Sequence, residues 1–421
     1  MKRSDNKTTP NQDNTFTSDI VHFDRSMPHV NGGVHYPIHP STQYNYASVS
    51  ALISVFQGKT KGNSPYSRQG TPTTAVLEAK LAQVEGGDGA IVFSTGMAAI
   101  TASFLSLLKA GDHIVVSKFL FGNTASLFNT MEGFGIEVTR VDPAEVINVE
   151  SALRQNTRIV FVETVANPGT QLPDLESIGE LCATKKIIYF VDNTVLSPYL
   201  FRPKAIKASL VIHSLTKSVA GQGQILGGVV INTGLYDWST YPNIFSAYRL
   251  GDSNKWGLMQ IRKKGLRDMG GTLTSHAAHL ISLGLETLAI RMDRSSETAL
   301  KMAIFLEGHD QVKKVYYPML ESHPSYLQAK KLFKAGSWLL SFELKDAENC
   351  LAFVDNLNIF IKATGLADSR SLIIPVAHTI FWEMGAQKRQ KMDISDGLLR
   401  VSVGLEESAC LIEDLKQAFD A

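Results

Sequence analysis

The chain has 421 residues, enough for two domains that each bury a hydrophobic core. Hydrophobic residues make up 44% of it and charged residues 19%, an ordinary composition for a globular enzyme. The formal net charge is +1 and the Lys and Arg residues are scattered, so neither a nucleic-acid-binding protein nor one attracted to an anionic membrane is expected.

The three cysteines, Cys182, Cys350 and Cys410, lack CxxC spacing, and no two histidines form an HxxxH pair on a predicted helix. We therefore expect neither a disulfide framework nor a metal site. The N-terminal residues are polar and do not resemble a secretion signal, and no run approaches the roughly 18 apolar residues of a membrane span. These features predict a cytoplasmic protein.

Residues 1–65 are predicted to form an N-terminal arm. About the first 20 residues are polar enough to be disordered, and Pro and Gly interrupt the remainder. Arms of this kind often pack on a partner subunit. After the arm, Ala75–Ala82 has the pattern of an amphipathic helix, with Thr73 or Thr74 as its expected N-cap.

Short β-branched runs then alternate with helical segments such as Ala98–Leu108 and Leu175–Thr184. The expected strands are Ala90–Phe93, His113–Val116, Ile136–Thr139, Arg158–Val162, Ile187–Val191 and Leu210–Ile212. This alternation predicts an α/β fold with a mostly parallel sheet covered on both faces.

Residues 235–268 form an aromatic and irregular stretch, and a long helical tract follows from about His276 to Glu307. Strand patterns at Ser337–Leu344 and Leu398–Val403 are mixed with helices. We therefore expect a large domain at 66–275 and a smaller C-terminal α+β domain at 276–421.

Lys217 follows the apolar run Leu210–Ile212, and Asp192 ends the run Ile187–Val191. The carboxyl ends of neighbouring parallel strands meet where ligands bind, so the two side chains are expected to lie close together. A pyridoxal phosphate (PLP) enzyme needs this pair: the lysine binds the aldehyde as a Schiff base, and the carboxylate keeps the pyridine nitrogen protonated. Because such residues are each common, the hypothesis also requires a phosphate site and a carboxylate clamp.

Two segments are candidates for the phosphate site. Ser94–Ala98 follows a strand and opens a helix, where glycine lets backbone N–H groups approach an anion, although a plain strand-to-helix turn has the same pattern. Ser214 and Thr216 precede Lys217. In an extended segment their hydroxyls lie on one side, suited to phosphate oxygens, while Lys217 points the other way.

Two further sites offer guanidinium groups for anions. Tyr66 and Arg68 place a phenol and a guanidinium two residues apart, which suits a phosphate but is also frequent on surfaces. Arg400 lies within an apolar strand, where an unpaired charge is costly. Either a substrate α-carboxylate or a structural salt bridge explains it.

Five segments together resemble the PLP enzymes of cysteine and methionine metabolism, a family that includes cystathionine γ-synthase and γ-lyase, methionine γ-lyase and the O-acylhomoserine sulfhydrylases. These segments are Tyr66–Thr73, Ser94–Ala99, Val191–Thr194, His213–Lys217 and Leu399–Glu406. They follow the family's order from about Gly32 to the C-terminus. The resemblance implies a fold-type I architecture, similar to that of aspartate aminotransferase.

The resemblance also implies individual roles. Lys217 is expected to bind the cofactor and move protons, Asp192 to pair with the pyridine nitrogen, and Asn167 to reach the side of the phenolic oxygen. Arg400 is expected to bind the carboxylate of a small amino-acid substrate. The phosphate is expected to be held by Gly96, Met97, Ser214 and Thr216.

Tyr66 and Arg68 are expected to reach the phosphate of a neighbouring subunit. The active unit would then be at least a dimer with shared active sites and, by resemblance, a homotetramer.

Three positions depart from the family's usual pattern. Where most members have a tyrosine that stacks on the cofactor ring, this chain has Phe121, which can stack but has no phenol to move protons. Asn123 stands where methionine γ-lyases often carry a cysteine, and Gly365 follows Thr364 where cystathionine-handling members have a glutamate before a serine. Phe121 therefore joins the catalytic candidates, and Asn123 and Gly365 join the substrate-binding ones.

The departures leave the reaction open. Phe121 with Gly122 is similar to the O-succinylhomoserine sulfhydrylases, whereas residues 234–238 and 265–270 resemble the O-acetylhomoserine branch. The first hypothesis is γ-replacement, in which an O-acylhomoserine takes sulfide or a small thiol to make homocysteine for methionine synthesis. The alternatives are γ-elimination of the methionine γ-lyase type, giving 2-oxobutyrate, ammonia and a thiol, then a cystathionine γ-synthase or γ-lyase, and last a non-catalytic PLP-binding protein.

Overall fold

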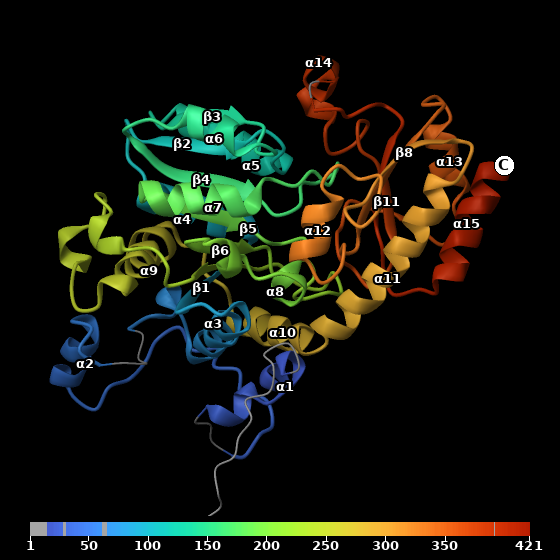
Figure 1. The fold of residues 1–421 in the computed structure, drawn as a ribbon. Helices are drawn as coiled ribbons and strands as arrows, with labels where there is room; N and C mark the ends of the chain where they lie inside the picture. Colours follow the sequence, from blue (N-terminus) through green and yellow to red (C-terminus); the bar gives the residue numbers. More distant parts are fainter. Residues whose placement is uncertain (1–14, 28–30, 61–64, 391) are drawn as a thin grey trace, which may run out of the picture.

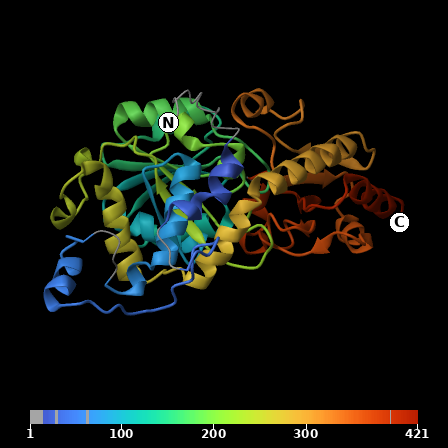
Figure 2. The ribbon, with the colours of Figure 1, turned by 90° about the horizontal axis from the view of Figure 1, so that it is seen from below.

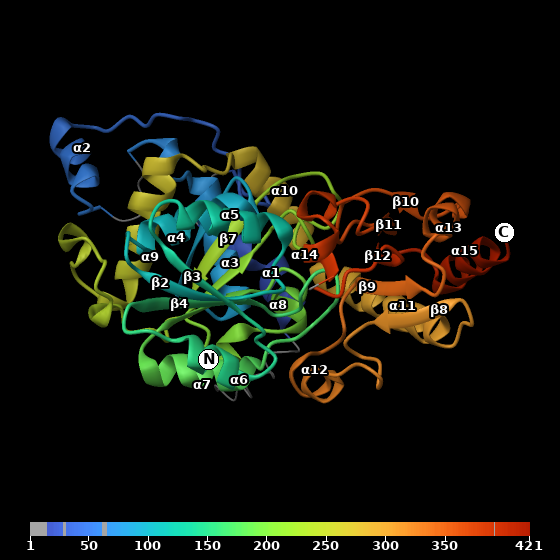
Figure 3. The same ribbon diagram turned by 90° about the horizontal axis from the view of Figure 1, so that it is seen from above.

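The computed structural model describes residues 15–27, 31–60, 65–390 and 392–421. Two sheets organise this part of the chain: a larger one in the N-terminal half and a smaller one towards the C-terminus (Figure 1). The two bodies lie side by side, and helix α11 (Leu288–Glu307) runs from one to the other (Figures 1 and 3).

The larger sheet has the strand order β1-β7-β6-β5-β4-β2-β3. Its strands are β1 (Gly89–Phe93), β2 (His113–Ser117), β3 (Glu137–Val141), β4 (Thr157–Glu163), β5 (Ile188–Asp192), β6 (Leu210–His213) and β7 (Gly228–Asn232). Only β7 is antiparallel to its neighbours; the other pairs of strands are parallel. The mostly parallel sheet expected from the sequence is therefore confirmed.

Helices cover both faces of this sheet because alternate strand residues point in opposite directions. Val92 and Val191 belong to one core with α3, α7 and α10, whereas Phe93 and Phe190 belong to the other with α4 and α5. The helices around the sheet are α3 (Pro72–Glu85), α4 (Gly96–Leu107), α5 (Gly122–Glu132), α6 (Val146–Ala152), α7 (Leu175–Lys185), α8 (Ser197–Leu200), α9 (Trp256–Gln260) and α10 (Ser275–Glu286).

Helix α3 begins earlier than expected. Thr71 is its N-cap, and its side chain accepts a hydrogen bond from the Thr74 backbone N–H. Pro72 occupies the first helical position, where its fixed φ favours the helix and its missing N–H is not needed. The expected cap at Thr73 or Thr74 is therefore wrong.

The aromatic insert, residues 235–268, is more regular than expected. It contains the turns η5 (Trp238–Thr240), η6 (Ser246–Tyr248) and η7 (Ser253–Lys255), then α9 and the π-helix η8 (Ile261–Arg267). Trp238 and Tyr241 are buried in the core beneath one face of the larger sheet, and the Tyr241 hydroxyl donates to the carbonyl of Leu107 at 2.6 Å. The insert is thus part of the packing of that face.

The smaller sheet has the strand order β10-β11-β12-β9-β8 and is antiparallel except between β10 and β11. Its strands are β8 (Val312–Tyr316), β9 (Leu339–Leu344), β10 (Ile361–Lys362), β11 (Leu372–Pro375) and β12 (Leu398–Ser402). The C-terminal helices are α12 (Tyr326–Leu332), α13 (Cys350–Asn356), α14 (Ala386–Gln390) and α15 (Ser408–Asp420), with the turn η9 (Trp382–Met384).

The helical tract expected from His276 to Glu307 consists of two helices, because α10 ends at Glu286 and Thr287 separates it from α11. Helix α11 belongs to both cores. Leu288 and Met292, near its start, pack in the core of the larger sheet, and Met302, near its end, packs in that of the smaller sheet.

Part of the N-terminal segment that was expected to be disordered forms a helix. Phe16–Val21 forms α1, in which Phe16 and Ile20 pack against the larger sheet's core, so the expected disorder is wrong for these residues. Residues 1–14 lie outside the described residues. Helix α2 (Val49–Phe56) projects from the body in Figures 1, 2 and 3. The described part of the chain has no helix whose length and hydropathy would suit a bilayer crossing.

Three further 3-10 turns lie in the part of the chain that surrounds the larger sheet. They are η2 (Phe23–Ser26), which follows α1, η3 (Ser67–Gln69), which precedes α3, and η4 (Pro203–Ile206), which follows α8. Arg68 lies in η3.

Candidate active site

A cavity of about 310 Å³ lies at the carboxyl ends of strands β4, β5 and β6. This is the edge where a parallel α/β sheet binds ligands. Nine of the predicted site residues line it: Gly96, Met97, Phe121, Asn123, Asn167, Asp192, Ser214, Thr216 and Lys217. Residues predicted from five separate segments of the sequence thus meet at one place.

Lys217 lies in a turn directly after β6. Its backbone N–H donates to the carbonyl of Ser214 at 3.1 Å, so the extended conformation expected for residues 214–217 is wrong. The segment after this turn packs closely on α10, since a Cβ at Gly284 would lie 2.4 Å from the carbonyl oxygen of Ala220. Burial, and secondarily the positive charge of Arg400, lower the pKa of Lys217. A lowered pKa increases the fraction of Lys217 that is present as the neutral, nucleophilic amine.

Asp192 ends β5 on the wall of the cavity. Its Oδ1 accepts the backbone N–H of Thr194 at 2.9 Å. Burial raises the pKa of Asp192, while hydrogen bonds from Thr194 and the nearby His213 oppose that shift. These contacts favour a carboxylate able to hold a proton on a ligand nitrogen.

Glu163 is a lining residue that the sequence reasoning missed. It ends β4, is opposite Asp192 in the strand register, and its Oε1 accepts the backbone N–H of Phe121 at 2.6 Å. Burial, then the charge of Asp192, raise its pKa well above the usual value. Glu163 directly follows the strand predicted at Arg158–Val162, and that position could have identified it as a candidate because ligands bind at the carboxyl ends of parallel strands.

The N-terminus of α4 forms one end of the cavity. Thr95 caps the helix by accepting the Ala98 backbone N–H at 2.9 Å. A Cβ at Gly96 would lie 2.9 Å from the Cβ of Ser214, so only glycine lets this helix end pack on the lysine turn. Free N–H groups and the helix dipole at such an end favour a phosphate.

Two threonines shape the turn beside this helix end. The Thr194 hydroxyl accepts the backbone N–H of Ser214 at 2.8 Å, and Thr194 was not predicted. The Thr216 hydroxyl accepts the N–H of Gly227 at 3.0 Å. Thr216 therefore holds the Gly227 backbone in addition to lining the cavity.

Asn167 supplies a test of whether the cavity suits PLP. The residue is 5% exposed, and its Oδ1 is buried without a hydrogen-bond partner among the described residues. A buried polar atom without a partner is costly unless a ligand or water satisfies it. With Lys217, Asp192 and the α4 end, it fits a ligand that carries an aldehyde, a ring nitrogen, a hydroxyl and a phosphate.

Arg400 and Gly365 do not line this cavity, although both were predicted for the site. Arg400 is 2% exposed on β12, and its Nη2 donates to the carbonyls of Thr364 at 3.0 Å and Gly365 at 3.3 Å. Its Nε has no partner among the described residues. Burial lowers the pKa of Arg400 to about 10. Gly365 thus contributes a carbonyl that orients the guanidinium.

Tyr66 and Arg68 are also outside the cavity lining. Tyr66 is 42% exposed, and the Arg68 Nη1 donates to the carbonyl of Arg267 at 2.6 Å. Within one chain they are therefore not assembled with the other predicted site residues.

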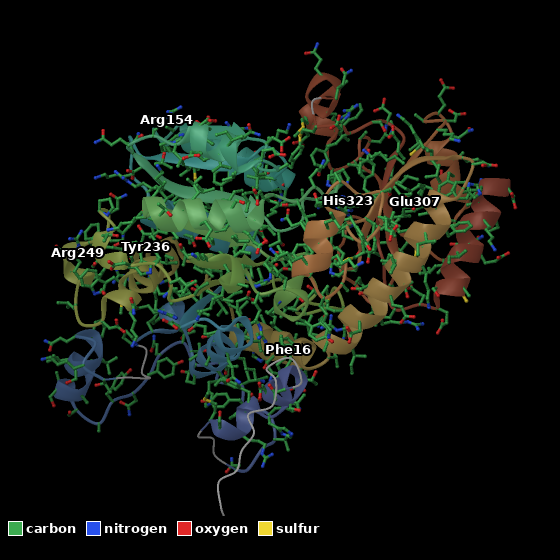
Figure 4. All side chains as sticks on the ribbon, in the orientation of Figure 1. Phe16, Arg154, Tyr236, Arg249, Glu307 and His323 are labelled. Atoms are coloured by element: carbon green, nitrogen blue, oxygen red, sulfur yellow. The ribbon has the colours of Figure 1, made fainter. Side chains whose placement is uncertain are left out.

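The C-terminal body contributes residues to the lining of the cavity, whereas the aromatic insert does not. Trp338 and Leu366 of the C-terminal body line the cavity, and no sequence motif marked them. No described residue of the insert does so. Figure 4 shows Tyr236 and Arg249 of the insert on the flank of the larger sheet that faces away from Glu307 and His323.

The sequence matches a family of known proteins over nearly its whole length. The model of the family described as Cys/Met metabolism PLP-dependent enzyme matches residues 17–420. An L-methionine gamma-lyase of Fusobacterium nucleatum subsp. polymorphum is 38% identical over 359 residues, which cover 84% of this chain and 86% of the relative. An O-acetyl-L-homoserine sulfhydrylase of Corynebacterium glutamicum is 32% identical over 424 residues, which cover 96% and 97%.

Solved structures show the same fold. The crystal structure of a putative O-acetylhomoserine (thiol)-lyase from Campylobacter jejuni has a TM-score of 0.91 and 33% identity, and the match covers 96% of this chain and 100% of that one. It contains a lysine joined to the cofactor as pyridoxyl-lysine monophosphate. A cystathionine gamma synthase from Xanthomonas oryzae pv. oryzae has a TM-score of 0.86 and 31% identity, with 98% of each chain covered.

The larger and smaller sheets are thus those of a fold-type I PLP enzyme, and the cofactor is pyridoxal phosphate. The reactions of the group take place at the Cγ of amino acids of sulfur metabolism. The chain belongs to the family of PLP-dependent enzymes of cysteine and methionine metabolism.

Proposed function

We propose that the protein catalyses γ-replacement, in which the acyloxy group on Cγ of an O-acylhomoserine leaves as a carboxylate and sulfide or a small thiol takes its place on Cγ. The observation that carries the proposal is Phe121, which lines the cavity without a hydroxyl. Among the described lining residues, the groups that titrate are Glu163, Asp192 and Lys217; none is a Tyr, His or Cys.

This lining favours a good leaving group. A carboxylic acid has a pKa of about 4 and a thiol one of about 8.5, so an ester leaves as a carboxylate without help, whereas a thiolate needs a proton. Phe121 cannot donate that proton. An O-acyl substrate therefore matches the lining better than a thioether such as methionine.

Bound PLP would withdraw electrons from the substrate's Cα and Cβ through its ring. Asp192 would keep the ring nitrogen protonated, and Asn167 Oδ1 would accept a hydrogen bond near the ring hydroxyl. The N–H groups of Gly96 and Met97 would bind the phosphate. Lys217 Nζ would take protons from Cα and Cβ, helped by its lowered pKa. Arg400 would bind the substrate's α-carboxylate.

The proposal is tested by supplying purified protein with O-acetylhomoserine or O-succinylhomoserine, each with and without sulfide. We expect homocysteine in the presence of sulfide, at a rate above that of 2-oxobutyrate release. Release of 2-oxobutyrate with no homocysteine rejects γ-replacement.

A second candidate is γ-elimination on methionine, favoured by the 38% identity to the Fusobacterium methionine gamma-lyase. Methionine supplied alone would then give 2-oxobutyrate, ammonia and methanethiol. Comparing kcat/KM for methionine with that for O-acetylhomoserine plus sulfide decides between the two reactions.

We also propose a shared active site between two copies of the chain, within a homotetramer. Among the described lining residues Lys217 is the one cation, and it is committed to the aldehyde, so a phosphate dianion needs another positive group. Arg68 of a second copy would supply it, with Tyr66 beside it. The projecting helix α2 supports contact between copies, because Val49 and Phe56 on it are 73% and 69% exposed.

A further inference from the structure

A buried arginine outside the cavity binds the segment that follows Lys217. Arg291, in the first turn of α11, is 8% exposed. Its Nη1 donates to the carbonyl of Ser218 at 2.6 Å, and its Nη2 to that of Val219 at 3.3 Å. These are the two residues directly after Lys217, so the guanidinium holds the main chain immediately beyond the lysine, at the 218–219 and 219–220 peptide groups.

The same guanidinium also holds the end of α10. Its Nη2 donates to the carbonyl of Gly284 at 2.6 Å, and its Nε donates to the Thr287 hydroxyl at 3.1 Å. Carbonyls in the last turn of a helix lack helical partners, and a cation there is favourable. Arg291 therefore ties the lysine turn to the junction of two helices.

The contacts of Arg291 are to neutral groups. None of its hydrogen bonds in the described structure goes to a carboxylate, and burial lowers its pKa to about 10. A buried cation without a counterion costs free energy, which the short bonds to carbonyls only partly offset. A residue that served packing alone would be better replaced by an apolar one.

Two glycines allow this close contact. A Cβ at Gly221 would lie 1.9 Å from the Arg291 Nη1, and a Cβ at Gly284 would lie 2.4 Å from the carbonyl oxygen of Ala220. The pocket between Arg291, Ser218, Gly221 and Trp338 offers about 10 Å³ to the centre of a water molecule, which is space for about one water. The contacts at the two glycines therefore limit how far the segment after Lys217 can shift towards the helices.

We propose that Arg291 is a positioning residue that holds the backbone of residues 218–219 so that Lys217 Nζ stays aimed at the cofactor and the substrate. It acts through the main chain and does not touch the reacting atoms. The inference rests on the proposed role of Lys217. Displacement of a reacting group by about 1 Å can cost about 10²-fold in rate, so a modest loosening of this turn is expected to be measurable.

The test compares Arg291→Met, which removes the donors and the charge, with Arg291→Lys, which keeps the charge but cannot reach all the carbonyls. Arg294→Met is the matched control: it lies one turn further along α11, its side chain is 41% exposed, and it donates to the carbonyls of Leu405 and Glu406 at 3.3 Å. Each variant is measured for kcat and KM with O-acetylhomoserine and sulfide, for PLP affinity of the stripped protein, and for the pH midpoint of the visible absorption of lysine-bound PLP.

We expect Arg291→Met to lower kcat by about 10²-fold with KM within about threefold. PLP affinity should fall, whereas the pH midpoint should stay at its wild-type value, because the charge that lowers the pKa of Lys217 is that of Arg400. Arg291→Lys should leave kcat about tenfold low, because it keeps the positive charge but cannot reach all the carbonyls. Arg294→Met should match the wild type.

Wild-type kcat in Arg291→Met, or full recovery of kcat in Arg291→Lys, overturns the inference. If Arg291→Met does not fold, the kcat of Arg291→Lys alone decides in the same way. Lys217→Ala separates the proposed role of Lys217 from that of Arg291. If this variant keeps the visible absorption of lysine-bound PLP after dialysis, the role proposed for Lys217 is wrong. If it loses that absorption while both Arg291 variants behave as wild type, only the role of Arg291 is rejected.

Discussion

Glu163 and Asp192 lie directly opposite each other at the ends of β4 and β5, so the protonation state of one carboxyl group affects the pKa of the other. The charge of Asp192 adds to burial in raising the pKa of Glu163, whereas the contacts with Thr194 and His213 hold down that of Asp192. Two adjacent carboxylates rarely both ionise in such a setting. The proton therefore belongs on Glu163 and the charge on Asp192.

This assignment predicts opposite outcomes for two conservative changes. Glu163→Gln imitates the protonated acid and can still accept the Phe121 N–H, so kcat should stay within about threefold of wild type at neutral pH. Asp192→Asn removes the charge that is proposed to hold the ring nitrogen's proton and should lower kcat by at least about 10²-fold. Steady-state kinetics on both variants check this, and equal losses would contradict the assignment.

Phe121→Tyr is expected to widen the range of leaving groups. The new phenol can supply the proton that a departing thiolate needs, so elimination from methionine should rise by about tenfold or more. Turnover of O-acetylhomoserine, whose leaving group needs no proton, should change by less than about threefold. Both rates are followed by 2-oxobutyrate and homocysteine assays on the same preparation, so the ester substrate serves as the internal control.

Arg400→Met is expected to affect both substrate binding and proton transfer. KM for the amino-acid substrate should rise by about 10²-fold, because its carboxylate loses a charged partner. The positive charge of Arg400 also helps to lower the pKa of Lys217. Without it that pKa should rise, so the acid limb of the pH–rate profile should move to higher pH. An unchanged KM and an unchanged limb would remove Arg400 from the site.

Mixing inactive variants tests whether Arg68 acts in a second copy. Arg68→Ala and Lys217→Ala should each be nearly inactive, but in a mixed dimer one site has both residues intact. Random reassociation after mild denaturation should therefore restore about a quarter of the wild-type activity. Lys217→Ala mixed with Asp192→Asn is the control, because both residues line the cavity of one chain. If the first mixture stays as inactive as the control, Arg68 does not act in trans.

His113 predicts a pH dependence of stability. Burial, with a smaller effect of Arg154, lowers its pKa from 6.5 to about 4. Its Nδ1 is 2.8 Å from the Thr157 hydroxyl and its Nε2 is 2.9 Å from that of Thr139, so the neutral ring bridges β2 to both neighbouring strands. Unfolded chains take up the proton near pH 6.5, whereas the folded protein resists it until about pH 4. The contribution of His113 to the free energy of unfolding is therefore fully present above about pH 6.5 and is lost as the pH falls towards about 4.

His113→Gln should weaken this dependence. Between about pH 6.5 and pH 5, the variant's loss of unfolding free energy should be about 1–2 kcal/mol smaller than that of the wild type. Urea unfolding followed by circular dichroism at the two pH values measures the difference. The exposed His276 provides the control, since His276→Gln should follow the wild type.

Much of the fold was predictable because the strands are β-branched runs that suit a pleated, buried sheet. Every strand expected in the larger sheet lies within two residues of its observed ends. The helix cap at Thr71 was missed because Pro72 was not recognised as a first helical residue. Strand β8 was missed because two lysines, Lys313 and Lys314, interrupt its apolar pattern.

The candidate site was predictable where a residue follows a strand, as Asp192 and Lys217 do, because strand ends in a parallel sheet converge. Local pattern was not enough for the conformation of residues 214–217, since Thr194 and Gly227, from other parts of the chain, form hydrogen bonds with this segment. The sequence did not predict the roles of Trp338 and Arg291, because their positions depend on how the C-terminal body and α11 pack against the larger sheet. Such contacts join residues that are far apart in the chain, so they produce no recognisable motif in the sequence.

Strand β12 is the last strand of the chain, yet it lies in the middle of the smaller sheet, between β11 and β9. Its neighbours therefore cannot complete their pairing until the ribosome has made nearly the whole polypeptide. The same strand carries Arg400. Arg400, proposed to bind the carboxylate of the substrate, is therefore synthesised well after Lys217, and its guanidinium can take its place only once the centre of the smaller sheet is complete.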